Sequence, residues 1–360
     1  MKATPKRTGW LWLAISILAL ASATALADER PLNCRDSGAR DGSPPVLELR
    51  VDNDLFANQD QGYTSGVALS LISPNLANYR HDQCLPAPAR WLNRYLEWWQ
   101  PQGFDQQNMV VRLDHRLYTP ADPQATELIE SDRPYAGIFT VSFGYNARER
   151  NNLRSSLFTL GMVGPSTHPE AIQDFIHDIT GSDHFQGWDN QLRDELVFMF
   201  GHERSQRLPV QGVWGDEDGF GADAIRSFGL GVGSLATYGS VGGEIRAGWK
   251  LPDDFGTSPL RPSGENSAPN VRARHARGWS AHGFASFEGR WMLRDISLDG
   301  NTWKNSHSVD REPLVAEAAI GLSIRYSRVK LSFARYFRSR EFSGQGDRPS
   351  YGSFTISAAF

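Results

Sequence analysis

The chain has 360 residues, of which 40% are hydrophobic and 22% are charged, and its formal net charge is −4. Residues 1–27 predict a secretory signal peptide, because three cations precede a short apolar run and the small residues Ala25 and Ala27 end it. Beyond it, 34 basic residues stand against 41 acidic ones, which excludes a basic nucleic-acid-binding protein. No window reaches the ~20 apolar residues that a transmembrane helix needs. We therefore expect one exported domain over residues 28–360.

The two cysteines, Cys34 and Cys84, are expected to form a disulfide. An exported protein folds in an oxidising compartment, where a disulfide is the default over a metal site or a catalytic thiol. Cys34 precedes the first predicted strand and Cys84 follows the second. Both would lie at the same end of an antiparallel hairpin, as a bridge requires.

Two-residue alternation of apolar and polar side chains runs through most of the chain. In the first such stretch, Leu47 and Leu49 share one face, while Glu48 and Arg50 share the other, which is typical of a β-strand. Short connections, such as those at 238–240 and 326–328, predict antiparallel hairpins. The predicted strands number twelve and span 46–54, 63–71, 108–117, 137–146, 154–162, 193–203, 224–236, 241–250, 279–296, 314–326, 329–338 and 351–360.

Charged residues within the strands favour a membrane barrel over a secreted β-sandwich. Glu48, Arg50, Glu244 and Arg246 would be buried in a sandwich, whereas a transmembrane barrel turns such residues into its interior and its apolar face to lipid. The last strand ends on Phe360, which resembles the ending of bacterial outer-membrane barrels. We predict an all-β fold, a twelve-stranded antiparallel transmembrane barrel in the outer membrane.

One segment, residues 161–192, breaks the alternation and predicts a short helix. Thr167 and Glu170 have the spacing of a capping box, and residues 180–182 end the helical pattern. Apolar residues at 172, 175, 176 and 179 form one stripe, while Gln173 and His177 share another face at positions i and i+4. This polar pair is either a solvated helix face or part of a functional site.

The parity of the strands predicts which connections face the exterior. With both termini periplasmic, the connections after odd-numbered strands are extracellular, including 55–62 and the helical segment. Asn53, Asp54 and Thr64 would then converge with Gln173 and His177 on the outer rim of the barrel. In the alternation, Asp54 and Thr64 take the lumen-facing phase, and Asn53 points outward unless a bulge re-aims it.

These residues suit metal-assisted hydrolysis of an ester. His177 can act as general base, because an imidazole titrates near neutral pH. Asp54, the Asn53 side chain and backbone carbonyls offer the oxygen ligands that suit Ca²⁺, and Mg²⁺ with less freedom. A hard cation there would stabilise the oxyanion that develops on an ester carbonyl.

Several sequence blocks together resemble the lipid A 3-O-deacylase family of the LpxR type. The blocks are VDNDLF, GYTSG, YTP, DRPYAG and GMVGP, in this order, followed by Gln173 and His177. The resemblance implies a twelve-stranded outer-membrane barrel that uses calcium to hydrolyse the 3′-acyloxyacyl ester of lipid A. It also implies a mechanism similar to that of secreted phospholipases A2, in which a His activates water and the metal supports the oxyanion.

The resemblance carries over to single residues. It places the family's Asn-Asp pair on Asn53 and Asp54, its threonine on Thr64, and its helical Gln and His on Gln173 and His177. The family's lysine after the YTP block has no counterpart, since residues 121–131 contain no Lys or Arg and Arg133 is the nearest cation.

Two other functions stay open at this point. An outer-membrane phospholipase would use a serine nucleophile, for which Ser65 and Ser182 are candidates. A structural barrel would leave His177 as an ordinary loop residue, but inward charges should block bulk conductance through so narrow a lumen. We expect a monomer whose partner is lipopolysaccharide.

Overall fold

The computed structural model describes residues 45–54, 62–76, 79, 85, 87–101, 103–209, 219–256 and 278–359. The predicted signal peptide, both cysteines, residues 55–61 and Phe360 lie outside the described residues. The disulfide and signal-peptide predictions are therefore untested.

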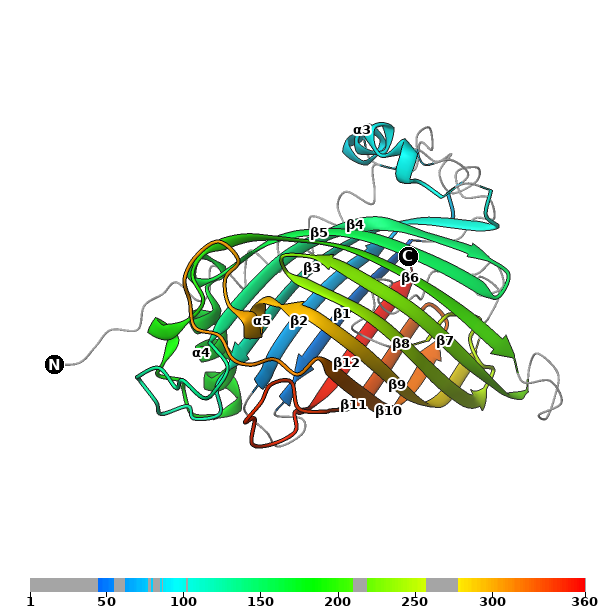
Figure 1. Ribbon diagram of the computed structural model, residues 1–360. Coiled ribbons are helices and arrows are strands. Elements are labelled where there is room, and N and C mark those ends of the chain that lie inside the picture. The colour runs from blue at the N-terminus through cyan, green and yellow to red at the C-terminus, as the bar shows by residue number, and fades with distance from the viewer. Residues whose placement is uncertain are drawn as a thin grey trace.

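Twelve antiparallel strands close into a barrel, in which each strand pairs with the next and β1 pairs with β12 (Figure 1). The predicted fold class and strand number are confirmed. The strands are β1 (Val46–Asn53), β2 (Gly62–Ile72), β3 (Gln106–Thr119), β4 (Ala136–Glu149), β5 (Asn152–Val163), β6 (Glu195–Pro209), β7 (Phe220–Gly233), β8 (Ala236–Trp249), β9 (Trp279–Asp295), β10 (Leu314–Tyr326), β11 (Val329–Arg338) and β12 (Ser350–Ala359).

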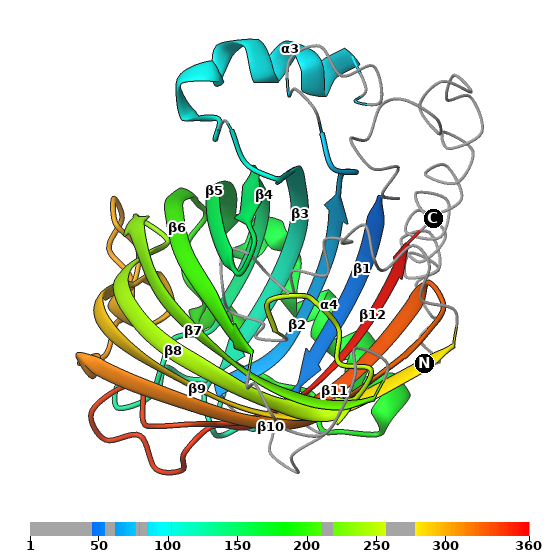
Figure 2. The same cartoon turned by 90° about the vertical axis from the view of Figure 1, so that its right-hand side faces the viewer.

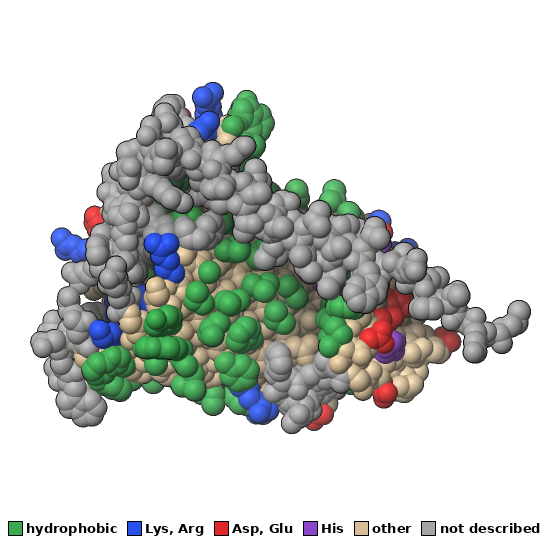
Figure 3. All heavy atoms as spheres, turned by 180° about the vertical axis from the view of Figure 1, so that it is seen from behind, with side chains coloured by type: hydrophobic (Ala, Val, Ile, Leu, Met, Phe, Trp, Pro, Cys, Tyr) green, Lys and Arg blue, Asp and Glu red, His purple; other side chains and the backbone are tan. Residues whose placement is uncertain are grey.

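The strands turn their apolar side chains outward. On β11, Leu331 and Phe333 are exposed, whereas their neighbours Lys330 and Ser332 are buried in the lumen. This is the reverse of a soluble protein and suits a lipid environment, where a closed barrel also leaves no strand edge unpaired. Hydrophobic side chains accordingly spread over the middle of the wall in Figure 3.

The connection between β7 and β8 differs from the prediction. The turn lies at Ser234 and Leu235, and residues 238–240, predicted as a turn, belong to β8. Residues 238–240 pair with β7 on one side and with β9 on the other, so the ladders hold them in the strand although local sequence would assign Gly239 to a turn. The Tyr238 ring centre lies 5.6 Å from the Arg290 guanidinium.

The described connections after odd-numbered strands lie at one end of the barrel, here called the outer end, and β12 finishes at the other, the inner end (Figures 1 and 2). The outer end carries α4 (Pro169–Thr180), α5 (Ile296–Asp299) and the 3₁₀ turns η3 (Pro165–Thr167) and η4 (Trp188–Asn190). The predicted extracellular helix is therefore present. Among the described helices, none is long and apolar enough to cross a membrane.

The long inner connection between β2 and β3 contains α3 (Ala87–Tyr95) and η2 (Glu97–Trp99), which lie beside the barrel wall (Figure 2). Trp99 packs against outward-facing Phe143 and Phe200, with ring centroids 6.0 and 5.6 Å apart. Trp98 is 83% exposed. The segment thus presents aromatic side chains at the membrane–water interface beside the inner end of the barrel, and such residues concentrate at membrane interfaces.

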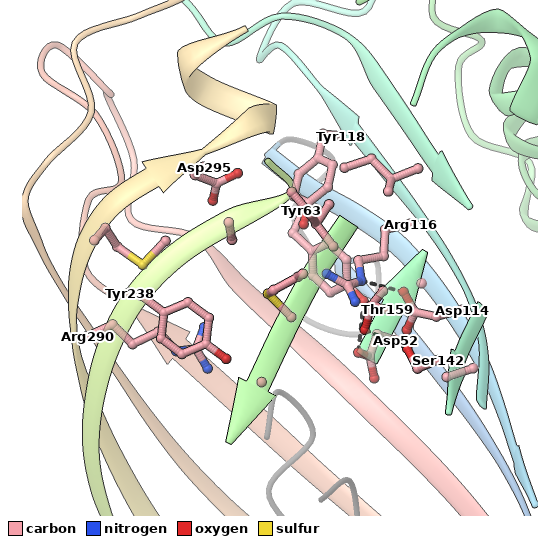
Figure 4. A pocket seen from close by; sticks show the side chains of 18 of the residues that line it. Asp52, Tyr63, Asp114, Arg116, Tyr118, Ser142, Thr159, Tyr238, Arg290 and Asp295 are labelled. Atoms are coloured by element: carbon pink, nitrogen blue, oxygen red, sulfur yellow. Dashed lines mark hydrogen bonds and ion pairs between the residues drawn. The ribbon is translucent and has the colours of Figure 1, made fainter. Parts of the chain in front are cut away.

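The lumen is filled mainly by charged side chains. Near the inner end, Arg246 pairs with Asp223 at 2.7 Å and with Asp254, and Asp254 also binds Lys330. A cavity of about 140 Å³ lies in the outer half, lined by paired residues such as Arg116 and Asp114 (Figure 4). The predicted inward charges are confirmed.

Candidate functional site

Helix α4 buries the polar pair Gln173 and His177 and exposes two residues of its apolar stripe. Gln173 and His177 are 1% and 2% exposed, whereas Phe175 and Ile179 are 43% and 70% exposed. A helix on the surface of a soluble protein shows the opposite arrangement. The solvated-face interpretation of this pair is therefore wrong.

The N-terminus of α4 differs from the prediction, whereas its C-terminus agrees with it. At the start, His168 is the N-cap with φ 53°, and the Thr167 hydroxyl donates to the Gly164 carbonyl at 2.8 Å, so the predicted capping box is wrong. At the end, Gly181 takes φ 74° and its N–H donates to the His177 carbonyl, as the predicted glycine stop requires. The Thr167 hydroxyl is unavailable to the helix because the preceding turn uses it.

The segment that leads into α4 docks on the outer surface of the wall. His115 of β3 occupies the outward-facing phase and bonds the Thr167 carbonyl through Nε2 at 3.0 Å. On β4, a Cβ atom at Gly137 would lie 2.4 Å from Thr167 Oγ1 and 2.5 Å from Pro169 Cβ. Only a residue without a side chain allows so close an approach at this position.

A small apolar cluster joins the wall to the α4 segment. It contains Leu117 of β3 with Tyr135, Phe185 and Trp188, and Ile172 of α4 packs against it. Burial raises the pKa of Tyr135 to about 12, so this phenol stays neutral at physiological pH. The cluster fixes the distance between the helix and the barrel wall.

Gln173 is oriented by the same cluster. The Trp188 indole N–H donates to Gln173 Oε1 at 3.1 Å, which turns the amide nitrogen away from the tryptophan. In the part of the chain that the structure describes, this buried Nε2 has no hydrogen-bond partner. A buried donor without a partner is costly and is suited to a ligand that supplies an acceptor.

A backbone carbonyl sets the tautomer of His177. Its Nδ1 lies 2.5 Å from the Asp183 carbonyl oxygen, and because a carbonyl only accepts, Nδ1 carries the proton. The basic lone pair is then on Nε2. The Phe185 ring packs 5.8 Å from the imidazole, whereas neighbouring His184 is more exposed and contacts Asp174 and Asp178.

Thr64 lies at a β-bulge and faces outward. The register between β2 and β3 shifts between Tyr63 and Ser65, so Thr64 is the extra residue. Its hydroxyl lies 2.6 Å from that of Thr119, which shares the outward-facing phase of β3 with Leu117. The predicted lumen-facing position is therefore wrong, because a bulge shifts the alternation by one residue.

Asn53 faces outward on β1, as its phase predicts, and is paired across the ladder with Ser65. It is only 9% exposed, and Asp54, which follows it, is 1% exposed. The structure therefore brings Asn53 and Thr64 together on the outer surface of adjacent strands. Gln173 and His177 reach the same side of the wall through the cluster around Leu117.

The oxygen ligands available at Asn53 and Asp54 are of the type that binds a hard cation. Asn53 and Asp54 contribute an amide and a carboxylate oxygen from consecutive, buried positions, which is the ligand chemistry of Ca²⁺. Among the residues with described coordinates, no group of three or more His, Cys, Asp or Glu side chains could enclose a metal ion. A cation would thus need neutral oxygens to complete its shell.

Arg133 does not supply the cation that residues 121–131 lack. Its side chain is 1% exposed, and it binds Glu341 at 3.1 Å and Ser297 at 2.9 Å. Burial would raise the pKa of the Glu341 carboxyl, but Arg338 and Arg133 outweigh that effect and hold it below its usual value. Arg133 is therefore a structural residue of the outer end.

Sequence reasoning missed Trp188, His115 and Gly137 as supports of the site. Each belongs to an element other than α4, and their contacts join residues 15 to 52 positions apart. The periodicity of a single segment carries no signal for such pairs.

The whole chain from residue 11 to residue 360 matches the family model described as outer membrane protein LpxR. Among solved structures, LpxR from Salmonella typhimurium is similar, with a TM-score of 0.65 and 18% sequence identity over 88% of this chain and 100% of that chain. The β domain of the Bordetella autotransporter BrkA aligns with a TM-score of 0.40 and 10% identity over 88% of this chain and 99% of that chain. The chain matches no curated protein sequence.

Proposed function

Because the chain belongs to the LpxR family of outer-membrane proteins, we propose that it is a calcium-dependent lipid A deacylase. It removes the 3′-acyloxyacyl chain by hydrolysis, on the outer surface of the barrel wall beside α4. Helix α4 carries this proposal, since it buries Gln173 and His177 on the outer side of the wall while Phe175 and Ile179 are exposed, as suits a helix beside lipid.

The location suits a lipid substrate. A lumen site would admit only molecules that enter the barrel, whereas a site on the outer surface meets lipids of the outer leaflet directly. Helix α4 lies at the end of the strands that carries the connections after odd-numbered strands. The esters of lipid A lie at this depth, where its sugars meet the acyl chains.

His177 acts as the general base. Its Nδ1–H bond to the Asp183 carbonyl leaves Nε2 to accept a proton from water as the water oxygen bonds to the ester carbonyl carbon. The bond from that carbon to the sugar oxygen then breaks, and His177 returns the proton to the departing oxygen. The products are the acyloxyacyl carboxylic acid and a lipid with a free 3′-hydroxyl.

The other polar residues orient the reacting groups. The Gln173 amide nitrogen, held by the bond from Trp188 to Oε1, donates to the substrate or to the attacking water. The Thr64 hydroxyl, beside Thr119, offers a further polar contact on the wall. Bound Ca²⁺, held by Asn53 and Asp54, would supply positive charge for the developing oxyanion.

The test uses the purified, detergent-solubilised protein with lipid A and mass spectrometry of the lipid. We expect loss of one 3′-linked acyloxyacyl unit with calcium and no loss with a chelator. Unchanged lipid A in the presence of calcium, from a protein shown to be folded, would contradict the proposed activity. Intact-protein mass spectrometry during turnover should show no acyl adduct; a stable adduct would contradict direct attack by water and indicate a serine nucleophile.

A further inference from the structure

The register of three strands puts an arginine beside the proposed site on the outer surface of the barrel. Arg335 of β11 pairs with Gly352 of β12, and Gly352 pairs with Asn53 of β1. Neighbouring strands lie about 4.8 Å apart, so Arg335 and Asn53 are separated by about two strand spacings. Gly352 has no side chain, and nothing from β12 itself stands between them at this level.

Arg335 points out of the barrel. Its neighbours Ala334 and Tyr336 are 4% and 2% exposed, while Phe333 and Phe337 are 49% and 44% exposed. Arg335 shares the phase of the two phenylalanines and is exposed. Its guanidinium lies 5.4 Å from the centre of the Phe337 ring.

Arg335 lies near the outer end of β11. Two register positions toward the inner end, the outward side chains on β1, β12 and β11 are Val51, Phe354 and Phe333. At the level of Asn53 they are replaced by Arg335, Gly352 and Ser65, and exposed Phe337 follows Arg335 on its outer side. An arginine on the lipid-facing surface is tolerated near an interface and is destabilising at the bilayer centre, which fits the position of Arg335, three residues before the outer end of β11.

Three further arginines on outward-facing strand positions lie nearer the opposite interface. Arg154 pairs with Arg204, and Arg226 bonds Gln206, all near the inner end of β5 to β7. These residues would face the inner leaflet. Arg335 differs from them in its outer depth and in its alignment with Asn53.

We propose that Arg335 binds a phosphate group of the anionic lipid whose ester lies at Asn53 and His177. This inference rests on the proposed function and names the substrate contact that Arg133 does not provide. A guanidinium binds phosphate through two parallel charge-assisted hydrogen bonds. The contact therefore orients the headgroup relative to Asn53 and selects phosphorylated lipids.

The test compares Arg335→Gln with the matched control Arg226→Gln, which removes an outward-facing arginine at the inner end. The substrates are lipid A and the same lipid after phosphate removal. We expect Arg335→Gln to raise KM for lipid A about tenfold, with kcat unchanged and no effect on the dephosphorylated lipid. Arg335→Lys should restore part of the loss, and Arg226→Gln should behave as wild type.

A binding measurement without turnover separates this inference from the proposed activity. Lipid A should bind Arg335→Gln about tenfold more weakly than wild type in detergent, whether or not the lipid is hydrolysed. Equal affinities, or an equal KM change for both lipids, would overturn the role of Arg335. Inorganic phosphate competing as strongly as lipid A would overturn the assignment to a lipid headgroup.

Discussion

At the scale of single residues, two contacts prepare the buried polar face of α4. The Asp183 carbonyl fixes the proton of His177 on Nδ1, and the Trp188 indole fixes the orientation of the Gln173 amide. Both contacts come from the segment that follows the helix. The tautomer of His177 and the orientation of the Gln173 amide therefore depend on the loop as much as on the helix.

Trp188→Phe tests this orientation. The substitution keeps an aromatic ring in the cluster with Tyr135 and Phe185 but removes the donor to Gln173. We expect kcat to fall about fivefold, the value of one net hydrogen bond, with KM nearly unchanged and the barrel folded. In the presence of Gln173→Ala, Trp188→Phe should lower kcat no further. Additive losses of kcat in the double variant would contradict the coupling of Trp188 to Gln173.

Asp54→Asn tests the metal assignment. The amide keeps the shape of the side chain but removes one negative charge from a position that is 1% exposed. Because ligand charge sets calcium affinity, we expect half-maximal activity to need about tenfold more calcium. An unchanged calcium titration would place the metal elsewhere.

The residue types of the site could be predicted, but their surroundings could not. The spacing of Gln173 and His177 places them on one helical face, and the phase of β1 turns Asn53 outward. The bulge at Thr64 has no local signature, because it depends on how β2 pairs with β3. The exposed apolar stripe of α4 likewise follows from where the helix docks, which periodicity alone does not determine.

At the scale of elements, the close approach of the segment leading into α4 to the wall requires a glycine at position 137. The Thr167 and Pro169 side chains occupy the space that a Cβ at Gly137 would need. Strand parity in the sequence places this helix at the outer end, but it does not show that the helix lies outside the barrel. That position decides which substrates reach His177.

Gly137→Ala should displace α4 from the wall. We expect activity to fall at least tenfold, because a misplacement of about 1 Å can cost that much or more, and protease cleavage within residues 164–192 to increase. Gly239→Ala is the matched control, since a Cβ there meets nothing within 4 Å. Equal activity in the two variants would contradict the role of the close approach.

At the scale of the whole molecule, networks of paired charges occupy the lumen, and the proposed site lies on the outer surface. Alternation, strand number and inward charges could all be predicted from the sequence, because the lipid-facing side of a barrel must be apolar. The specific partners could not, since Arg246 reaches Asp223 on β7 and Asp254 beyond β8. Such pairings depend on the closed shape of the barrel.

Arg246→Ala should destabilise the barrel. It leaves Asp223 and Asp254 buried with less compensating charge, and breaking a buried pair costs about 3–5 kcal/mol. When samples are heated before gel electrophoresis, we expect the folded form of the variant to be lost at a lower temperature than that of wild type. Arg226→Ala, on the exposed side of β7, should have no effect; equal shifts would contradict a stabilising lumen network.

The most direct test of the account is mass spectrometry of lipid A from cells that express wild type, His177→Ala or His184→Ala at equal levels of folded protein. His184 is the neighbouring, more exposed histidine and serves as the matched control. We predict loss of the 3′-acyloxyacyl unit with wild type and His184→Ala and intact lipid A with His177→Ala. Deacylated lipid A from cells with His177→Ala would contradict the assignment of His177 as the base.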